Sequence, residues 1–270
     1  MTRRTTLITG ATQGMGRALA LDLAPRGGTL LLHGRNPDRL EAVAAAARDA
    51  APDTTVRTYL ADLSDLEQVH AMADRIRGAE PHLDGLINNA VAGGGVEPLK
   101  RELSRQGHEL RFAVNHLAPY ALTRDLLPLL ISSAPARVIN VASIGQDAID
   151  FDDVMLEQGY EGLRAYCRSK VAMIMATFEL AAELRGSGVT VNALHPAHLM
   201  DTDGVREYGL TPLTSTEEGV RPTVRLLLDP ELATTTGRYF DQFRDARAHE
   251  QTYDAEARER LMRLTRSLTG

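Results

Sequence analysis

Tyr166 and Lys170 lie four residues apart in a stretch whose pattern predicts a helix over 164–186. Residues at this spacing share one face of a helix, so the phenol and the ammonium would stand one above the other. A neighbouring cation stabilises phenolate and lowers the pKa of tyrosine from about 10, and a shift to about 7 requires about 4 kcal/mol. The pair is therefore a candidate proton donor of adjustable acidity, although the same spacing also occurs on ordinary amphipathic helices.

A glycine-rich turn follows the first predicted strand, 5–9, and precedes a predicted helix over 17–26. The turn reads Gly10-Ala11-Thr12-Gln13-Gly14-Met15-Gly16. Glycines let the backbone approach a phosphate closely, and a helix N-terminus offers free N–H groups and a partial positive charge. The spacing is G-x-x-x-G-x-G, which differs from the commonest dinucleotide motif, G-x-G-x-x-G. Alone, it is also compatible with an ordinary tight turn.

Three more polar positions occur where an α/β sheet holds its ligands. Ser143 closes the strand-like run 137–142, and Asn88-Asn89-Ala90 follows the strand-like run 85–87. Asn115 lies inside a helix expected over about 107–127. Ligands of open α/β sheets bind at the carboxyl ends of the strands. Each position alone could be a turn residue or a buried hydrogen-bonding group.

In this order, the motifs resemble the short-chain dehydrogenase/reductase family over about 5–240. The resemblance implies an enzyme that moves hydride between a nicotinamide cofactor and a carbonyl or alcohol, with no metal site. Tyr166 would protonate the substrate oxygen, Ser143 would hydrogen-bond to it, Lys170 would lower the tyrosine pKa and hold the nicotinamide ribose, and Asn115 would position a water. The implied cofactor contacts are Gly10, Thr12, Gln13, Gly14, Met15, Gly16, Asp62, Leu63, Asn89, Tyr166, Lys170 and Pro196.

Later features resemble the retinol-dehydrogenase-like branch, which implies a lipophilic carbonyl substrate. Ser143 and Tyr166 are 23 residues apart, a long interval, and the chain also carries the motif Gly237-Arg238-Tyr239-Phe240 and a late helix expected over 255–268. Two positions depart from the family pattern, since Val91 and Ala197 stand where glycine is usual. His198 is either a substrate contact, an auxiliary proton carrier or an exposed loop residue.

The choice of cofactor is argued from charge at the end of the second predicted strand. This place reads His33-Gly34-Arg35-Asn36, with no acid before Asp38. A carboxylate there would accept the ribose 2′-hydroxyl of NAD, whereas an arginine accommodates a 2′-phosphate. We therefore expect NADP(H) to be preferred, with Arg35 and Asn36 among the cofactor contacts and NAD(H) as the alternative. Arg17 is either a second cation or an exposed helix residue.

Composition limits the other classes of function. The chain has 270 residues, a formal charge of −6 and one cysteine, Cys167. It gives no electrostatic reason to expect nucleic acid or anionic membrane as a partner. It has no apolar run of 18 residues, and a first strand at residue 5 leaves no room for a signal peptide. We expect a soluble, cytoplasmic enzyme with a small-molecule substrate and no membrane insertion. A homo-oligomer stays open, as does a non-catalytic NADP(H)-binding regulator or scaffold.

Strand-like and helix-like runs alternate along the chain. This alternation predicts α/β architecture: a single-domain Rossmann-type doubly wound parallel sheet of about seven strands, with helices on both faces. One domain would cover 1–270, with substrate-site elements at about 195–270. Three segments, 91–99, 145–163 and 197–212, are expected to roof the substrate site and to order with ligand. The remaining strands are expected at 29–33, 54–60, 83–88, 138–141, 189–194 and 237–240, with helices at 37–50, capped by Asn36, and from Ser64 or Asp65 to about 77.

Overall fold

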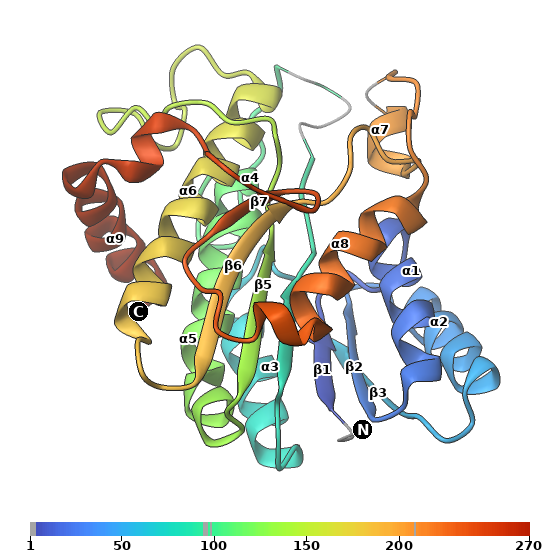
Figure 1. Ribbon diagram of the computed structural model, residues 1–270. Helices are drawn as coiled ribbons and strands as arrows, with labels where there is room; N and C mark the ends of the chain where they lie inside the picture. Colours follow the sequence, from blue (N-terminus) through green and yellow to red (C-terminus); the bar gives the residue numbers. More distant parts are fainter. Residues whose placement is uncertain (1–3, 94–96, 98, 208) are drawn as a thin grey trace.

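The computed structural model describes residues 4–93, 97, 99–207 and 209–270, and its centre is one eight-stranded sheet (Figure 1). The strand order is β3-β2-β1-β4-β5-β6-β7-β8, and every pairing is parallel except that of β7 with β8. The predicted fold class is confirmed, with one strand more than the expected seven. The strands are β1 (Thr5–Ile8), β2 (Thr29–Gly34), β3 (Thr55–Leu60), β4 (Gly85–Asn88), β5 (Ala136–Val141), β6 (Val189–His195), β7 (Tyr239–Asp241) and β8 (Arg244–Ala246).

Helices cover both faces of the sheet. One hydrophobic core joins the sheet to α1, α2 and α8, and the other joins it to α3, α5 and α6, on which α9 packs. The helices are α1 (Gly14–Leu23), α2 (Pro37–Ala50), α3 (Leu66–Ala79), α4 (Leu110–Phe112), α5 (Ala118–Ser132), α6 (Gly162–Glu183), α7 (Asp203–Glu207), α8 (Thr216–Leu228) and α9 (Ala255–Thr269). A π-helix (Ala113–Leu117) joins α4 to α5, and 3₁₀ turns span Ala24–Arg26, Pro230–Leu232 and Glu250–Tyr253.

The central strands are buried on both sides. Leu7 of β1 and Leu86 of β4 belong to one core, while their sequence neighbours Ile8 and Ile87 belong to the other. Successive side chains of a strand point to opposite faces, so a strand covered on both faces must be apolar at every position. This explains the short continuous apolar runs in the sequence.

Side-chain caps set the starts of several helices. The Asn36 side chain accepts a hydrogen bond from Arg39 N at 2.9 Å, as its predicted role requires, and Pro37 occupies the first turn. Asp65, rather than Ser64, caps α3. The helical stretch expected over about 107–127 is confirmed, with bounds of 110–132, and α4, a π-helix and α5 follow one another in it without a break. The helix α8, which begins with a capping box at Ser215, was not predicted.

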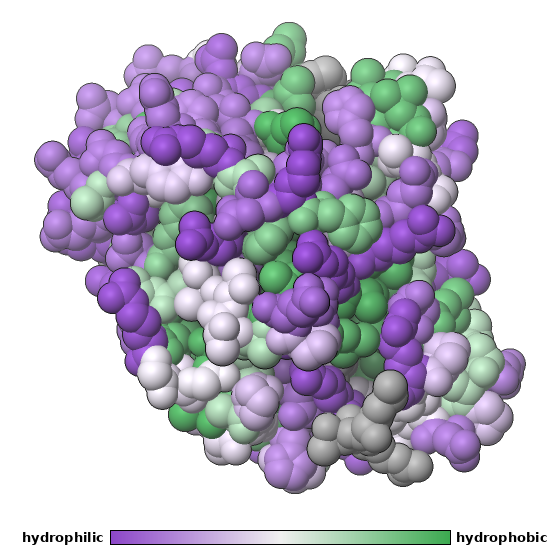
Figure 2. Space-filling view, in the orientation of Figure 1, coloured by the Kyte–Doolittle hydropathy of each residue, from purple (hydrophilic) through white to green (hydrophobic). Residues whose placement is uncertain are grey.

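The carboxyl ends of the parallel strands form one edge of the sheet, called here the carboxyl edge, at the top of Figure 1. Large apolar side chains are exposed in segments that follow these strand ends: Val91, Ile144, Leu163, Leu213 and Phe243 each expose roughly half of their surface or more. Figure 2 shows apolar surface at the same upper end of the molecule. In the part of the chain that the structure describes, no helix is both long and apolar enough to cross a membrane.

Candidate active site

The carboxyl edge brings the predicted site residues into one region. Ligands of open α/β sheets bind at this edge, where the order of the strands reverses about β1 and β4. The residues come from the turns after six strands: Gly10 to Gly16 after β1, Arg35 and Asn36 after β2, Asp62 and Leu63 after β3, Asn89 after β4, Ser143 after β5, and Pro196 after β6. The helix α6 adds Tyr166 and Lys170, and the π-helix adds Asn115.

Two glycines of the glycine-rich loop, Gly10 and Gly16, have no room for a side chain. Gly10 has a φ of 65°, and a Cβ added to it would lie 2.8 Å from Ala90 Cα. A Cβ on Gly16 would lie 2.1 Å from Gly10 O and 2.6 Å from Asn89 Nδ2. Gly10 requires glycine because its backbone is left-handed and closely packed, and Gly16 requires it because its backbone lies against the Gly10 carbonyl. The loop opens directly into α1, whose first N–H groups are available to an anion.

Asn89 ties the loop to the end of β4. Its Nδ2 donates hydrogen bonds to Thr9 O at 2.9 Å and to Gly10 O at 3.2 Å, and its backbone N–H donates to Thr9 Oγ1 at 2.9 Å. The predicted residue therefore lies beside the glycine-rich loop, and its side-chain amide is used to shape that loop.

His33 holds the other side of the loop, a role that the sequence did not reveal. Its Nδ1 accepts a hydrogen bond from Gly10 N at 3.2 Å, so its Nε2 carries the proton and donates to Ala61 O at 3.1 Å. Burial lowers the pKa of His33 from 6.5 to about 4. The ring is therefore neutral at pH 7, as both hydrogen bonds require.

Arginines surround the end of β2, where the charge argument placed the 2′-phosphate. Arg35 is exposed directly after the strand, and Arg17 is exposed in the first turns of α1. Arg39, not singled out from the sequence, donates a hydrogen bond to Gln13 Oε1 at 3.0 Å and so joins α2 to the glycine-rich loop. Asp62 follows β3, the strand beside β2, and accepts hydrogen bonds from Ser64 N and Oγ at 2.9 and 2.8 Å.

Lys170 and Tyr166 meet as the helical spacing predicts. Lys170 Nζ lies 5.5 Å from the centroid of the Tyr166 ring and donates a hydrogen bond to Val141 O at 2.8 Å. The lysine is only 1% exposed, and burial lowers its pKa to about 7. An ammonium whose charge is poised near neutral pH thus stands over the phenol.

Ser143 lies next to this pair. A methyl group added at Gly145 would be 3.5 Å from Ser143 Oγ and 3.7 Å from Tyr166 Cε1, so the hydroxyl and the edge of the phenol flank the same small space. Ser143 Oγ accepts a hydrogen bond from Gly145 N at 3.0 Å. A serine hydroxyl that accepts a hydrogen bond keeps its own proton, which it can donate to another oxygen atom.

Asn115 occupies the middle of the π-helix and is fully buried. Its amide donates to Ala92 O and to Ser169 Oγ, both at 2.9 Å, and accepts from Ala92 N at 2.8 Å. Ser169 Oγ in turn donates to Tyr166 O at 2.6 Å. Single π-turns inside helices are frequent at functional sites. Here the π-turn lets Asn115 join the segment after β4 to the helix that carries Tyr166.

The segment after β6 packs beside the glycine-rich loop. The methyl group of Thr202 lies 3.1 Å from where a Cβ of Gly14 would be. His198 is exposed, and its ring centroid is 6.3 Å from that of His195, which is buried. Burial lowers the pKa of His195. Among the described residues, none hydrogen-bonds to its Nε2.

The long interval between Ser143 and Tyr166 forms a loop held from two sides. Gln251 exchanges hydrogen bonds with the backbone of Ile149, at 2.7 and 2.9 Å. On the other side, Tyr160 donates to Glu109 Oε1 at 3.0 Å, within a buried cluster that contains Arg111. The segment 145–163 is thus already held by hydrogen bonds without a ligand. That a segment over the substrate site becomes ordered when ligand binds stays a prediction, chiefly for 197–212. Within 91–99, residues 94–96 and 98 lie outside those described.

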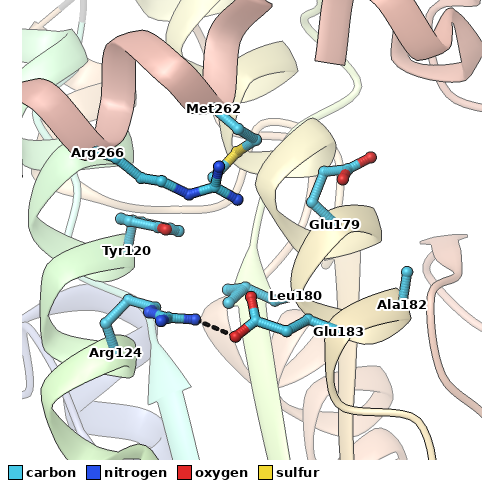
Figure 3. A pocket seen from close by; sticks show the side chains of 8 residues that line it. All are labelled: Tyr120, Arg124, Glu179, Leu180, Ala182, Glu183, Met262 and Arg266. Carbon is cyan, nitrogen blue, oxygen red and sulfur yellow. Dashed lines mark hydrogen bonds and ion pairs between the residues drawn. The ribbon is translucent and has the colours of Figure 1, made fainter. Parts of the chain in front are cut away.

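A pocket of about 480 Å³ lies elsewhere, between α5, α6 and α9 (Figure 3). Its walls include Tyr120, Met262 and the ion pair of Arg124 with Glu183, and it contains none of the predicted site residues. In the described ranges, no three His, Cys, Asp or Glu side chains are grouped so that they could hold a metal ion.

Comparison with known proteins identifies the family of this chain. The sequence model of the family described as short chain dehydrogenase matches residues 4–211. Retinol dehydrogenase 13 of Homo sapiens is 36% identical over 285 residues, covering 99% of this chain and 85% of that protein. Retinol dehydrogenase 14 of Mus musculus is 33% identical over 295 residues, covering 99% of this chain and 86% of that protein.

Two solved structures extend the likeness to three dimensions. A protein from Mycobacterium paratuberculosis superimposes with a TM-score of 0.79 at 29% identity, covering 98% of this chain and 93% of its own. A short chain dehydrogenase from Escherichia coli CFT073, complexed with NADPH, gives a TM-score of 0.73 at 29% identity, covering 88% and 96%. This chain belongs to the short-chain dehydrogenase/reductase family. It is an oxidoreductase, and within the family it is similar to the retinol dehydrogenases.

Proposed function

We propose that this enzyme moves hydride between NADP(H) and the carbonyl or alcohol group of a lipophilic small molecule. The observation that carries the proposal is that Tyr166 and Ser143 flank one small space at the carboxyl edge, with the Lys170 ammonium over the tyrosine ring. When bound, the cofactor supplies or accepts the hydride. The protein supplies the proton, the hydrogen bonds to the reacting oxygen, and the orientation of both reactants.

The proton steps follow from the groups at this space. In the direction of reduction, Tyr166 donates its proton to the substrate oxygen, and Ser143 hydrogen-bonds to the same oxygen. Lys170, when protonated, stabilises the tyrosinate that remains. Asn115 holds the segment after β4 against α6, and we propose that it also positions the water through which Lys170 recovers a proton from solvent.

NADP(H) is proposed in preference to NAD(H) because the end of β2 is cationic. Arg35 is exposed there, and the first acid of α2 is Asp38. A guanidinium forms charge-assisted, forked hydrogen bonds with a phosphate, whereas a carboxylate would repel it. The NADPH in the related Escherichia coli structure supports the same choice. The remaining proposed contacts are Gly10, Thr12, Gln13, Gly14, Met15, Gly16, Asn36, Asp62, Leu63, Asn89 and Pro196.

A lipophilic substrate is proposed from the exposed apolar side chains at the carboxyl edge. Ile144, Leu163, Leu213 and Phe243 come from four separate segments that follow strand ends or begin α6, and all are exposed. Exposed apolar side chains at an edge that binds ligands are typical of sites for apolar ligands. The similarity to retinol dehydrogenases supports the same substrate class. Residues 195–270 would supply part of the substrate site within one domain that spans 1–270.

An assay of NADPH oxidation over a panel of short and long-chain carbonyl compounds tests this function. We expect turnover with long-chain aldehydes or ketones, and a loss of at least about 100-fold in Tyr166→Phe, the scale of a missing general acid. Binding of NADPH, measured by fluorescence titration, should change only a few-fold. Tyr120→Phe, on α5 away from the site, is the matched control. NADPH binding without turnover of any carbonyl would instead support the non-catalytic regulator or scaffold.

Two further proposals concern the setting of the enzyme. We propose a cytoplasmic location, supported by the single cysteine, Cys167, which can form no intrachain disulfide. Cell fractionation tests it, and recovery of the protein with the membrane fraction would contradict it. Size-exclusion chromatography with light scattering decides whether the protein is a monomer or a homo-oligomer.

A further inference from the structure

The backbone of Ser143 is held by side chains from outside its own strand. The bond from Ala142 N to Leu194 O, at 2.8 Å, continues the pairing of β5 with β6 by one residue, and Ser143 lies beyond it. The carbonyl oxygen of Ser143 accepts a hydrogen bond from the Tyr239 hydroxyl at 2.9 Å and another from Gln146 Nε2 at 2.8 Å. Two donors therefore fix the peptide that carries the hydroxyl of the site.

Tyr239 is well placed to act as a rigid donor. It begins β7, is 3% exposed, and packs in a small core with Ala142, Met173 and Ala193. Burial, with the nearby carboxylate of Asp241, raises the pKa of Tyr239. The phenol therefore keeps its proton at neutral pH, as its donation to Ser143 O requires.

Gln146 is anchored to the same late part of the chain. Its Oε1 accepts a hydrogen bond from His249 N at 2.6 Å, which leaves its Nε2 aimed at Ser143 O. Both donors to Ser143 thus depend on residues 239–249, about one hundred positions later in the sequence. Phe240, the next residue of the Gly237–Phe240 motif, belongs to the opposite core. The tyrosine of this motif alone reaches the site.

We propose that Tyr239 is a positioning residue for the reaction, which with Gln146 fixes the Ser143 peptide so that the serine hydroxyl meets the substrate oxygen. The proposal rests on the proposed function, in which Ser143 contacts that oxygen. The serine side chain is attached to the backbone that these two donors hold. A rotation of that backbone would therefore move the hydroxyl and disturb its 3.0 Å hydrogen bond from Gly145 N. A displacement of about 1 Å in a reacting group can cost about 100-fold in rate.

The first test is a double-mutant cycle between Tyr239 and Ser143. Tyr239→Phe removes the hydroxyl and keeps the ring, and we expect kcat to fall about tenfold while the Kd for NADPH changes less than about twofold. In the Ser143→Ala background, the same change should lower kcat by less than about twofold, because the group that it positions is already gone. An equal, multiplicative loss in both backgrounds would overturn the proposal. Tyr120→Phe, which removes the hydroxyl of a buried tyrosine on α5 away from Ser143, is the control and should leave kcat nearly unchanged.

The second test needs no turnover. Hydrogen exchange of the peptide covering 142–147 reports on the Gly145 N–H, which is bonded to Ser143 Oγ. We expect exchange to be several-fold faster in Tyr239→Phe, with no change in α6, and an unchanged rate would refute the positioning role. If Tyr239→Phe does not fold, Gln146→Met removes the other donor from a half-buried position and should show the same two effects. A wild-type protein that reduces no carbonyl would overturn the proposed function, whereas the exchange result would still decide the role of Tyr239.

Discussion

Replacing His33 with glutamine is expected to remove a large part of the pH dependence of stability. The ring accepts a hydrogen bond from Gly10 N and donates one to Ala61 O, so only the neutral form fits. Burial lowers the pKa of His33 from 6.5 to about 4, whereas in the unfolded chain the ring titrates at about 6.5. Between these values the unfolded state binds more protons, so the free energy of unfolding falls as the pH falls from 6.5 to 4.

The magnitude follows from the difference between the two pKa values. A gap of about 2.5 pH units corresponds to about 3 kcal/mol, which is fully present above pH 6.5 and lost near pH 4. The ring is 3% exposed, so solvent screening reduces this little. For a domain whose total stability is about 5–15 kcal/mol, this loss is large. Burial lowers the pKa of His116 to about 3. This histidine therefore also reduces the free energy of unfolding at low pH, but it does so equally in the wild type and in His33→Gln.

Urea unfolding at pH 7, 6, 5 and 4, followed by circular dichroism, measures the effect. Between pH 7 and 4 the free energy of unfolding should fall by about 3 kcal/mol more in the wild type than in His33→Gln, whatever the absolute stability of the variant. His82→Gln, at an exposed imidazole before β4, is the control and should follow the wild type. Parallel curves for the wild type and His33→Gln would show that the ring is not kept neutral by its burial.

The other predictions concern the cofactor and the roof of the site. Arg35→Asp should weaken NADPH about tenfold or more relative to NADH, as measured by titration of both cofactors, and an unchanged ratio would show that the arginine faces elsewhere. Gly16→Ala should abolish detectable NADPH binding, because its Cβ would lie 2.1 Å from a loop carbonyl oxygen, while Gly78→Ala, which meets no atom within 4 Å, should bind normally. Lys170→Ala should lower both NADPH affinity and turnover, and a loss in turnover alone would argue against a contact with the ribose. Hydrogen exchange at 197–212 should slow when NADPH and a substrate analogue bind, and equal rates would exclude a closing roof.

Most helices and strands could be predicted from the sequence because their caps and apolar patterns depend on residues within or next to each element. Asn36 and Asp65 cap helices through their own side chains, and the apolar runs of the central strands reflect burial on both faces. The helix α8 was missed although its capping box, Ser215 with Glu218, is readable in the sequence, because Gly219 and Pro222 lie inside it. The strand β8 has three residues, too few for a pattern to develop.

The features of the site likewise fall into those that follow from local spacing and those that depend on tertiary packing. The meeting of Tyr166 with Lys170 follows from helical spacing and is confirmed. The π-turn at Asn115 has no signature in composition, because it depends on how the helix packs between the segment after β4 and α6. The bond from Tyr239 to Ser143 joins residues 96 positions apart, and only the assembled sheet brings them together. Such contacts come from tertiary packing, which no single stretch of sequence encodes.

The residues that hold Ser143 lie near the end of the chain, and this determines the order in which parts of the site can form during synthesis. The bonds that shape the glycine-rich loop come from residues up to Asn89, so they can form on the ribosome as soon as the first half of the chain has emerged. Ser143 is not held until 239–249 have emerged and joined the sheet. A nascent chain would therefore shape its glycine-rich loop before the peptide of Ser143 is fixed, so the two parts of the site would form at different stages of synthesis.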